Sequence, residues 1–335
     1  MKKEAMLYEK SGERVHCFLC AHHCKISNGK FGFCGVRENI DGKLYTYVYG
    51  DVMARQVDPV EKKPLYHFLP GTQTYSIATP GCNFHCDFCQ NWQISQRSFR
   101  DGTAGRGIPM TPRTIVEAAK EAGCKSISYT YTEPTIFFEY AYDIAVLAHE
   151  AGLRNVFVSN GFMTSQAIEK ISSYLDAINI DVKAFTDSFY HDQCAARLQP
   201  VLDSIKLIKE KGIWLEVTTL LIPGRNDSTE ELNAIASFIA KTGKGIPWHI
   251  SRFHPDYQYT DAPVTPSESL HKAREIGKKH GLEYVYLGNI AEDTSSFCPR
   301  CDSRVIDRSR AYGARSLLQE GHCPSCGFLI NGVWE

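Results

Sequence analysis

Residues 79–91 read TPGCNFHCDFCQN and place Cys82, Cys86 and Cys89 in one C-x3-C-x2-C loop. The loop directly follows residues 74–78, a run typical of a β-strand. A structural zinc site usually closes with four protein ligands, and an ordinary 4Fe–4S cluster takes four thiolates. Three thiolates in one tight loop can ligate three irons of a 4Fe–4S cluster and leave the fourth iron open. The spacing therefore predicts an open cluster, with a zinc knuckle that takes its fourth ligand elsewhere as the alternative.

The composition is that of an ordinary globular protein, with 43% hydrophobic and 22% charged residues in a chain of 335. A formal net charge of −1 gives no field that would gather nucleic acid or an anionic membrane surface. Charges of both signs occupy the N-terminal ten residues, and no run of eighteen apolar residues occurs. We therefore expect a cytoplasmic protein without membrane contact and without a nucleic-acid partner.

The thirteen cysteines are expected to be metal ligands rather than disulfides, because the cytoplasm keeps thiols reduced. All but two fall into three groups, of which the loop above is the middle one. Cys124 and Cys194 stand alone, and we interpret them as buried small hydrophobic residues.

The N-terminal cysteines follow a C-x2-C-x3-C-x9-C pattern, which supplies enough ligands for a zinc ion or for an auxiliary iron–sulfur cluster. A short, loop-rich segment needs a metal to hold its fold, so a structural metal without chemistry is our expectation. Its ligands are expected among Cys17, Cys20, Cys24 and Cys34, with His16, His22 and His23 as alternatives.

The C-terminal cysteines form two Cys-Pro-x-Cys knuckles separated by 21 residues. Paired knuckles at this distance are typical of a zinc ribbon, and a rubredoxin-like iron site is the alternative. The four ligands would be Cys298, Cys301, Cys323 and Cys326.

Short apolar runs and amphipathic stretches alternate between about residues 72 and 290, which predicts a parallel sheet covered by helices. Strands are expected at 75–79, 126–131, 155–159, 177–182, 214–222, 248–253 and 283–287. Helices are expected at 111–122, 136–151, 165–174, 198–211, 228–242 and 266–280.

This alternation fits either a doubly wound sheet or an incomplete barrel. Polar residues follow strand after strand, and barrel chemistry occurs at the carboxyl ends of strands, so we favour the barrel. We therefore expect an α/β fold with an incomplete (β/α)6 TIM-like barrel at 72–290. A Cys-rich N-terminal segment would occupy 1–71, with a strand at 44–50 and an extended linker at 58–67. A zinc-ribbon-like C-terminal domain would occupy 291–335.

Five polar residues near the predicted strand ends are candidate ligand contacts, and each also has a structural alternative. Glu133 precedes a proline, which holds it away from the following helix, but it could simply stabilise a helix start. Asn160 could belong to a turn with Gly161, and Asp181 could form a structural ion pair with Lys183. The fifth residue, His254, follows the sixth strand, where the nearby His249 could be an ordinary core histidine.

Together these motifs resemble the radical S-adenosylmethionine (SAM) superfamily, and in particular the pyruvate formate-lyase activating enzymes. The resemblance implies that the open iron binds SAM and that Glu133 receives its ammonium group. It places Asn160, Asp181, Lys183 and His254 around SAM, with Asp181 and His254 nearest the ribose hydroxyls. Two departures are clear in the sequence. Tyr131 and Thr132 replace the glycines of the usual Gly-Gly-Glu-Pro motif, and Val158 replaces an acidic residue.

Further motifs look like those of the AmmeMemoRadiSam-system radical SAM enzymes. They include CGVREN at 34–39, KPLYHF at 63–68 and SRFHP at 251–255. This resemblance covers nearly the whole chain, but it does not indicate a substrate.

The resemblance implies an oxidoreductase in which the reduced cluster cleaves SAM to a 5′-deoxyadenosyl radical that abstracts hydrogen from a substrate. It suggests a protein substrate, such as a glycyl radical enzyme, and an electron donor such as flavodoxin or ferredoxin. The alternatives are radical modification of a small molecule or RNA, or a non-catalytic adaptor with zinc in all three cysteine groups.

Overall fold

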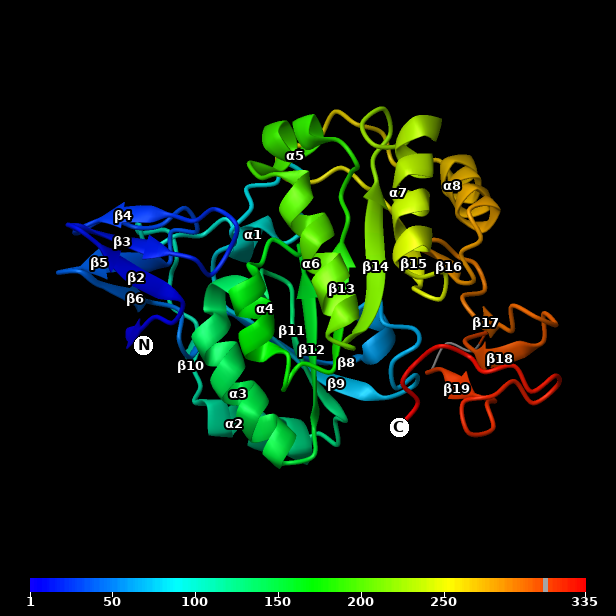
Figure 1. Ribbon diagram of the computed structural model, residues 1–335. Helices are drawn as coiled ribbons and strands as arrows, with labels where there is room; N and C mark the ends of the chain where they lie inside the picture. The colour runs from blue at the N-terminus through cyan, green and yellow to red at the C-terminus, as the bar shows by residue number, and fades with distance from the viewer. Residues whose placement is uncertain (310–312) are drawn as a thin grey trace.

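The computed structural model describes residues 1–309 and 313–335. Within this part of the chain the main sheet has eight strands, and the seven strands other than β8 are parallel to one another (Figure 1). β8 (Ala54–Pro59) pairs antiparallel with the first parallel strand at one edge. The parallel strands are β9 (Gln73–Ala78), β11 (Ser126–Tyr129), β12 (Arg154–Ser159), β13 (Ala177–Asp181), β14 (Trp214–Leu221), β15 (Trp248–Arg252) and β16 (Val285–Gly288).

The order of the strands distinguishes between the two arrangements that the sequence left open. A doubly wound sheet reverses its strand order near the middle, whereas a (β/α) barrel keeps the order of the chain. Here the parallel strands follow chain order from β9 to β16. The edges of the sheet are β8 and β16, which are not paired with each other, so the sheet is open. The predicted α/β fold with a parallel sheet is confirmed.

Helices follow the strands, and some of their starts carry side-chain caps. The Thr111 side chain accepts a hydrogen bond from the Thr114 amide, with Pro112 in the first turn. Ser228 caps a later helix in the same way. The helices are α1 (Trp92–Ser95), α2 (Pro112–Glu121), α3 (Phe138–Glu150), α4 (Ser165–Ile171), α5 (Asp187–Cys194), α6 (Leu198–Glu210), α7 (Thr229–Thr242) and α8 (Ser267–Lys279). The short 3-10 helices are η1 (Val60–Lys62) and η2 (Pro134–Phe137).

Residues 58–67 differ from the prediction. Instead of forming an extended linker, Asp58 and Pro59 end strand β8, and η1 follows directly. Most of β8 is exposed, because it lies at the edge of the sheet and needs no apolar alternation. Helix α5 was also missed, because its sequence carries no apolar stripe.

The N-terminal segment forms small antiparallel sheets on one side of the main sheet (Figure 1). The strand expected at 44–50 ends earlier, at Thr46. The strands of this segment are β1 (Lys3–Glu4), β2 (Tyr8–Ser11), β3 (Arg14–Cys17), β4 (Lys25–Ser27), β5 (Arg37–Ile40), β6 (Lys43–Thr46) and β7 (Asp51–Val52). Strand β7 pairs with β10 (Ile108–Pro109).

A buried ion pair ties this segment to the helical layer. Arg37 on β5 donates from Nη2 to both carboxylate oxygens of Glu139 on α3, at 2.7 and 2.5 Å. Neither side chain is exposed beyond 2%. Glu139 also accepts a hydrogen bond from the Met6 amide at 2.6 Å. Glu139 therefore joins β5 and the bend between β1 and β2 to a helix that lies about 100 residues further along the chain.

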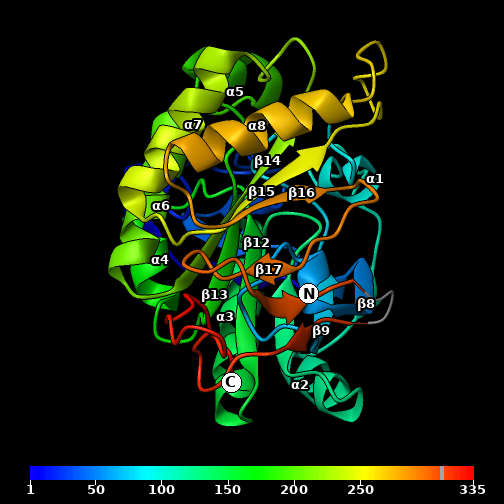
Figure 2. The same cartoon turned by 90° about the vertical axis from the view of Figure 1, so that its right-hand side faces the viewer.

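The C-terminal tail lies on the other side of the main sheet, as Figures 1 and 2 show. Its strands are β17 (Ser296–Phe297), β18 (Arg304–Asp307) and β19 (Arg315–Ser316). His67 attaches it to the sheet: Nδ1 contacts the Asn331 carbonyl at 2.7 Å, and Nε2 contacts the Tyr286 hydroxyl at 2.6 Å. Burial lowers the pKa of His67 to about 4, so the ring is neutral at neutral pH. Residues 310–312 of the predicted C-terminal domain lie outside the described residues.

None of the described helices is long and apolar enough to cross a lipid bilayer.

Candidate active site

The three cysteines of the central loop line one cavity of about 390 Å³ beyond the end of β9. Gly81 turns the chain into this loop with a φ of +97°, and a Cβ there would lie 2.7 Å from Val36 Cγ1. Cys82 Sγ accepts a hydrogen bond from the Phe84 amide at 3.3 Å, and Cys89 Sγ lies 3.1 Å from Ser95 Oγ. Burial raises the pKa of both thiols. A positively charged metal centre would reverse this effect by stabilising the thiolates.

Glu133 lines the same cavity, and its carboxylate is buried. Oε1 accepts hydrogen bonds from the Thr135 amide and hydroxyl and from the Ser159 hydroxyl, at 3.0, 2.6 and 2.8 Å. Oε2 accepts one from the Asn160 amide at 2.8 Å. These donors are all neutral, and Glu133 forms no ion pair with the described part of the chain. Burial therefore raises its pKa despite the hydrogen bonds. A buried carboxylate without a cation is a ready acceptor for a charged amine.

Asn160, Asp181 and Lys183 line the same cavity. Asn160 Nδ2 donates to Asn83 Oδ1 at 2.7 Å, which ties the end of β12 to the cysteine loop. The Lys183 ammonium lies 3.0 Å from the Asp181 carboxylate. Burial alone would lower the pKa of Lys183, but the Asp181 charge raises it overall. The ion pair weighed as a structural alternative is therefore present, and it also faces the cavity.

His254 is placed differently from the other four candidates, because it is exposed and does not line the cavity. Its Nδ1 lies 3.1 Å from Nε2 of Gln90, which does line it. His249 is a buried core histidine, with Nε2 at 2.6 Å from the Glu216 carboxylate.

Tyr131 and Lys63 form a part of the cavity lining that was not predicted from the sequence. Tyr131 occupies a position that is usually glycine in the resembled motif, and it adopts a left-handed φ of +63°. Its hydroxyl donates to Asp58 at 2.5 Å, and the Lys63 ammonium lies 2.7 Å from Asp58 and 4.5 Å from the centre of the Tyr131 ring. Both Tyr131 and Lys63 line the cavity. In the sequence, the run Lys62–Lys63–Pro64 was the only sign of this part of the cavity. No sequence pattern indicates that it contacts Tyr131.

Cys194 is buried, as predicted, but it does not stand alone. It ends α5 beside the cysteine loop, where its carbonyl accepts a hydrogen bond from the His85 amide at 3.0 Å. Its thiol contacts Cys86, and this hydrogen bond, together with burial, raises the pKa of Cys86. A fourth thiol therefore lies next to Cys86.

The two outer cysteine groups differ in geometry. In the C-terminal group all four sulfurs lie within 4.8 Å of one another. Two of their separations are 3.6 Å (Cys298–Cys326) and 3.7 Å (Cys301–Cys323). The N-terminal four line a separate, smaller cavity. Each outer group therefore has four cysteines of its own. The central three cysteines belong to neither of these two groups.

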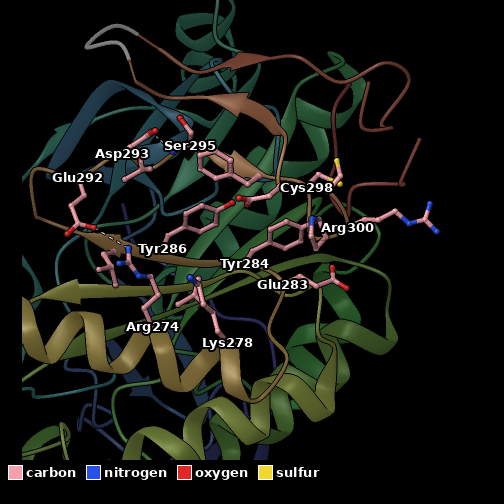
Figure 3. A pocket seen from close by; sticks show the side chains of 17 residues that line it. Arg274, Lys278, Glu283, Tyr284, Tyr286, Glu292, Asp293, Ser295, Cys298 and Arg300 are labelled. Carbon is pink, nitrogen blue, oxygen red and sulfur yellow. Dashed lines mark hydrogen bonds and ion pairs between the residues drawn. The ribbon is translucent and has the colours of Figure 1, made fainter. Parts of the chain in front are cut away.

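A larger cavity of about 580 Å³ lies between α8, β16 and the start of the C-terminal tail (Figure 3). Arg274 and Lys278 project into it from α8, and Arg274 Nη1 lies 3.2 Å from the Glu292 carboxylate. None of the predicted SAM contacts lines it. Its size alone therefore does not make it the active site.

Residues 76–238 match the Radical SAM superfamily. The chain belongs to this superfamily. The radical SAM chain is 44% identical to the uncharacterized protein MJ0808 of Methanocaldococcus jannaschii over 99% of both chains. It is 20% identical to the pyruvate formate-lyase-activating enzyme of Listeria monocytogenes, over 68% of this chain and 92% of that one.

The crystal structure of a radical SAM methyltransferase from Sphaerobacter thermophilus shares the fold, with a TM-score of 0.51 and 17% identity. The match covers 66% of this chain and 67% of the other.

Membership identifies the chain as an enzyme and implies a 4Fe–4S cluster and SAM. The residues fit both groups. Three thiols face one cavity without a fourth cysteine lining it, which suits a cluster with an open iron. The buried Glu133 carboxylate in the same cavity lacks a cationic partner, which the SAM ammonium would supply.

Proposed function

We propose that this radical SAM enzyme binds its cluster on Cys82, Cys86 and Cys89 and holds SAM in the 390 Å³ cavity, with Glu133 accepting the ammonium group. The observation that carries this proposal is the presence, in one cavity, of three thiols and a buried carboxylate that has only neutral donors. When bound, the cluster and SAM supply a 5′-deoxyadenosyl radical for hydrogen abstraction.

The chain's own residues would bind and orient SAM. Asn160 is held by Asn83, and Asp181 and Lys183 form an ion pair, so these groups are positioned before SAM arrives. We expect Asp181, which lines this cavity, to contact the ribose hydroxyls of SAM. His254 would reach SAM only by moving from its contact with Gln90.

The Glu133→Gln variant tests this arrangement, because it removes the charge and nearly keeps the shape. A hydrogen bond to a charged group contributes about 1.5–3 kcal/mol, so SAM should bind about ten- to a hundred-fold more weakly. The measurement is equilibrium binding of SAM to the anaerobically reconstituted protein, with iron content determined in parallel.

Ser159→Ala is the matched control. It removes one donor to Glu133 but leaves the carboxylate charge, so SAM affinity should change by less than about threefold. Equal affinities for Glu133→Gln and Ser159→Ala, at equal iron content, would rule out an ammonium contact at Glu133.

We further propose a protein as the substrate, as in activating enzymes, because the Listeria relative is named for its action on pyruvate formate-lyase. The enzyme would receive electrons from a flavodoxin- or ferredoxin-type donor in the cytoplasm. Membership in an enzyme superfamily argues against the non-catalytic zinc adaptor.

Proteins that co-purify with the chain provide the test. Incubated anaerobically with the enzyme, SAM and dithionite, one of them should develop a glycyl radical signal in electron paramagnetic resonance (EPR) spectra. The control omits SAM. If 5′-deoxyadenosine accumulates while no protein radical appears, the small-molecule or RNA alternative replaces the protein substrate.

A further inference from the structure

We propose that Cys17, Cys20, Cys24 and Cys34 bind an auxiliary iron–sulfur cluster rather than a zinc ion. The four cysteines line one cavity in the N-terminal segment, so they form a single site. The three histidines considered as substitutes do not line it. His22 Nε2 instead lies 2.7 Å from the Asn83 carbonyl, and His16 Nδ1 lies 3.1 Å from Glu9.

The spacing of the sulfurs distinguishes the two metals. Four thiolates about 2.3 Å from one zinc ion lie roughly 3.8 Å apart at the corners of a tetrahedron. The C-terminal group fits this spacing, with Cys298–Cys326 and Cys301–Cys323 sulfur separations of 3.6 and 3.7 Å. In the described part of the chain, it is the only group of three or more such ligands that all lie within 4.8 Å of one another. No three of the N-terminal sulfurs are therefore that close.

A cluster accounts for the wider spacing, because each thiolate binds a different iron or shares an iron with only one other. The central group, Cys82, Cys86 and Cys89, provides an internal comparison. The superfamily of this chain implies a 4Fe–4S cluster, and the three sulfurs of the central group are likewise not all within 4.8 Å of one another. The N-terminal group thus resembles the central group in spacing and differs from the C-terminal one.

The walls of the N-terminal cavity also suit a cluster. Leu19, Ile26, Phe33 and Ile136 contribute apolar surface, and Arg37 provides a positive charge near the sulfurs. The Phe33 amide donates to Cys24 Sγ at 3.4 Å, and the amides of Leu19, His22 and Val36 donate to Cys17, Cys20 and Cys34. Hydrogen bonds to sulfur and exclusion of water are two means by which a protein sets a cluster's reduction potential.

The site lies beside the central cysteine loop and the residues that follow β12. Cys20 pairs with Met163 in an isolated β-bridge, and the Ala21 amide donates to the Phe162 carbonyl. The contact of His22 with Asn83 reaches the residue that follows Cys82. One hydrogen bond and a short run of covalent bonds therefore join the two cysteine loops.

The experiment compares two variants of the full chain, reconstituted anaerobically with iron and sulfide. The first replaces Cys82, Cys86 and Cys89 with alanine, and it should retain about two to four irons with equal acid-labile sulfide. Its reduced EPR spectrum should not change when SAM is added, because four thiolates leave no open iron. The second replaces Cys17, Cys20, Cys24 and Cys34 with alanine, and its spectrum should still respond to SAM.

Acid-labile sulfide decides the result, because neither a zinc site nor a single-iron site contains it. A first variant without sulfide, together with wild-type protein that carries about four sulfides and two zinc ions, would overturn the proposal. If the second variant does not fold, the sulfide of the first variant and of the wild type decides alone. Sulfide retained by the first variant supports the auxiliary cluster even if SAM binding by the wild type is absent, so this test is separate from that of the proposed function.

Discussion

Replacing Cys86 with alanine is expected to reduce SAM cleavage to the level of the protein-free reaction. The central loop has only three thiols for the cluster, and no other cysteine lines the cavity. Cys86 is 7% exposed, so an external thiol cannot readily reach its place. The measurement is 5′-deoxyadenosine formed under dithionite after anaerobic reconstitution with iron and sulfide.

Cys124→Ala is the control, since it removes another buried cysteine that lines neither cysteine cavity, and it should cleave SAM like the wild type. Cys194 requires a second control, because its thiol contacts Cys86. Should Cys86→Ala retain activity, adding Cys194→Ala would show whether the neighbouring thiol has replaced the missing ligand. Activity in both the single and the double variant would contradict ligation by Cys86.

Arg37→Ala is expected to lower the free energy of unfolding by about 3–5 kcal/mol, because it leaves the Glu139 carboxylate buried without its cation. The Arg37–Glu139 pair also joins the N-terminal segment to α3. The measurement is the midpoint of guanidinium unfolding followed by circular dichroism under anaerobic conditions. Iron content is measured on the same samples, since Arg37 also lines the N-terminal cysteine cavity.

Arg154→Ala provides a control with the same chemistry and different burial. Arg154 lies 2.9 Å from Asp176, but its side chain is 47% exposed, so its loss should cost no more than about 1 kcal/mol. In the Arg37→Ala background, Glu139→Gln removes the uncompensated charge and should restore part of the stability. Equal effects of Arg37→Ala and Arg154→Ala would show that burial does not determine the strength of the pair.

The parallel sheet could be predicted because short, continuous stretches of sequence indicate its strands and helices. Most of its strands are short apolar runs, and some of its helices begin with a side-chain cap, as at Thr111 and Ser228. The edge strand β8 was missed because an exposed edge needs neither an apolar run nor alternation. Helix α5 was missed for a related reason, since packing and not its own sequence pattern defines it.

The candidate site could be predicted where a residue lies at the carboxyl end of a strand or in the loop just beyond it, as Glu133, Asn160 and Asp181 do. Parallel strands in one sheet bring their carboxyl ends to the same edge, so these residues had to lie near one another. The contacts of Tyr131 with Asp58 and Lys63, and of Cys194 with Cys86, join residues about 70 to 110 positions apart. A single sequence contains no pattern that relates such residues.

The pairing of β8 with β9 restricts where a shortened version of the protein can begin. A fragment that begins at residue 72 would keep the parallel strands but lose β8, which covers one side of β9 along its whole length. The freed amides and carbonyls of β9 would then form a new edge able to pair with another copy of the fragment. Aggregation during expression is the expected result, so a shortened chain should begin before residue 54 and retain β8.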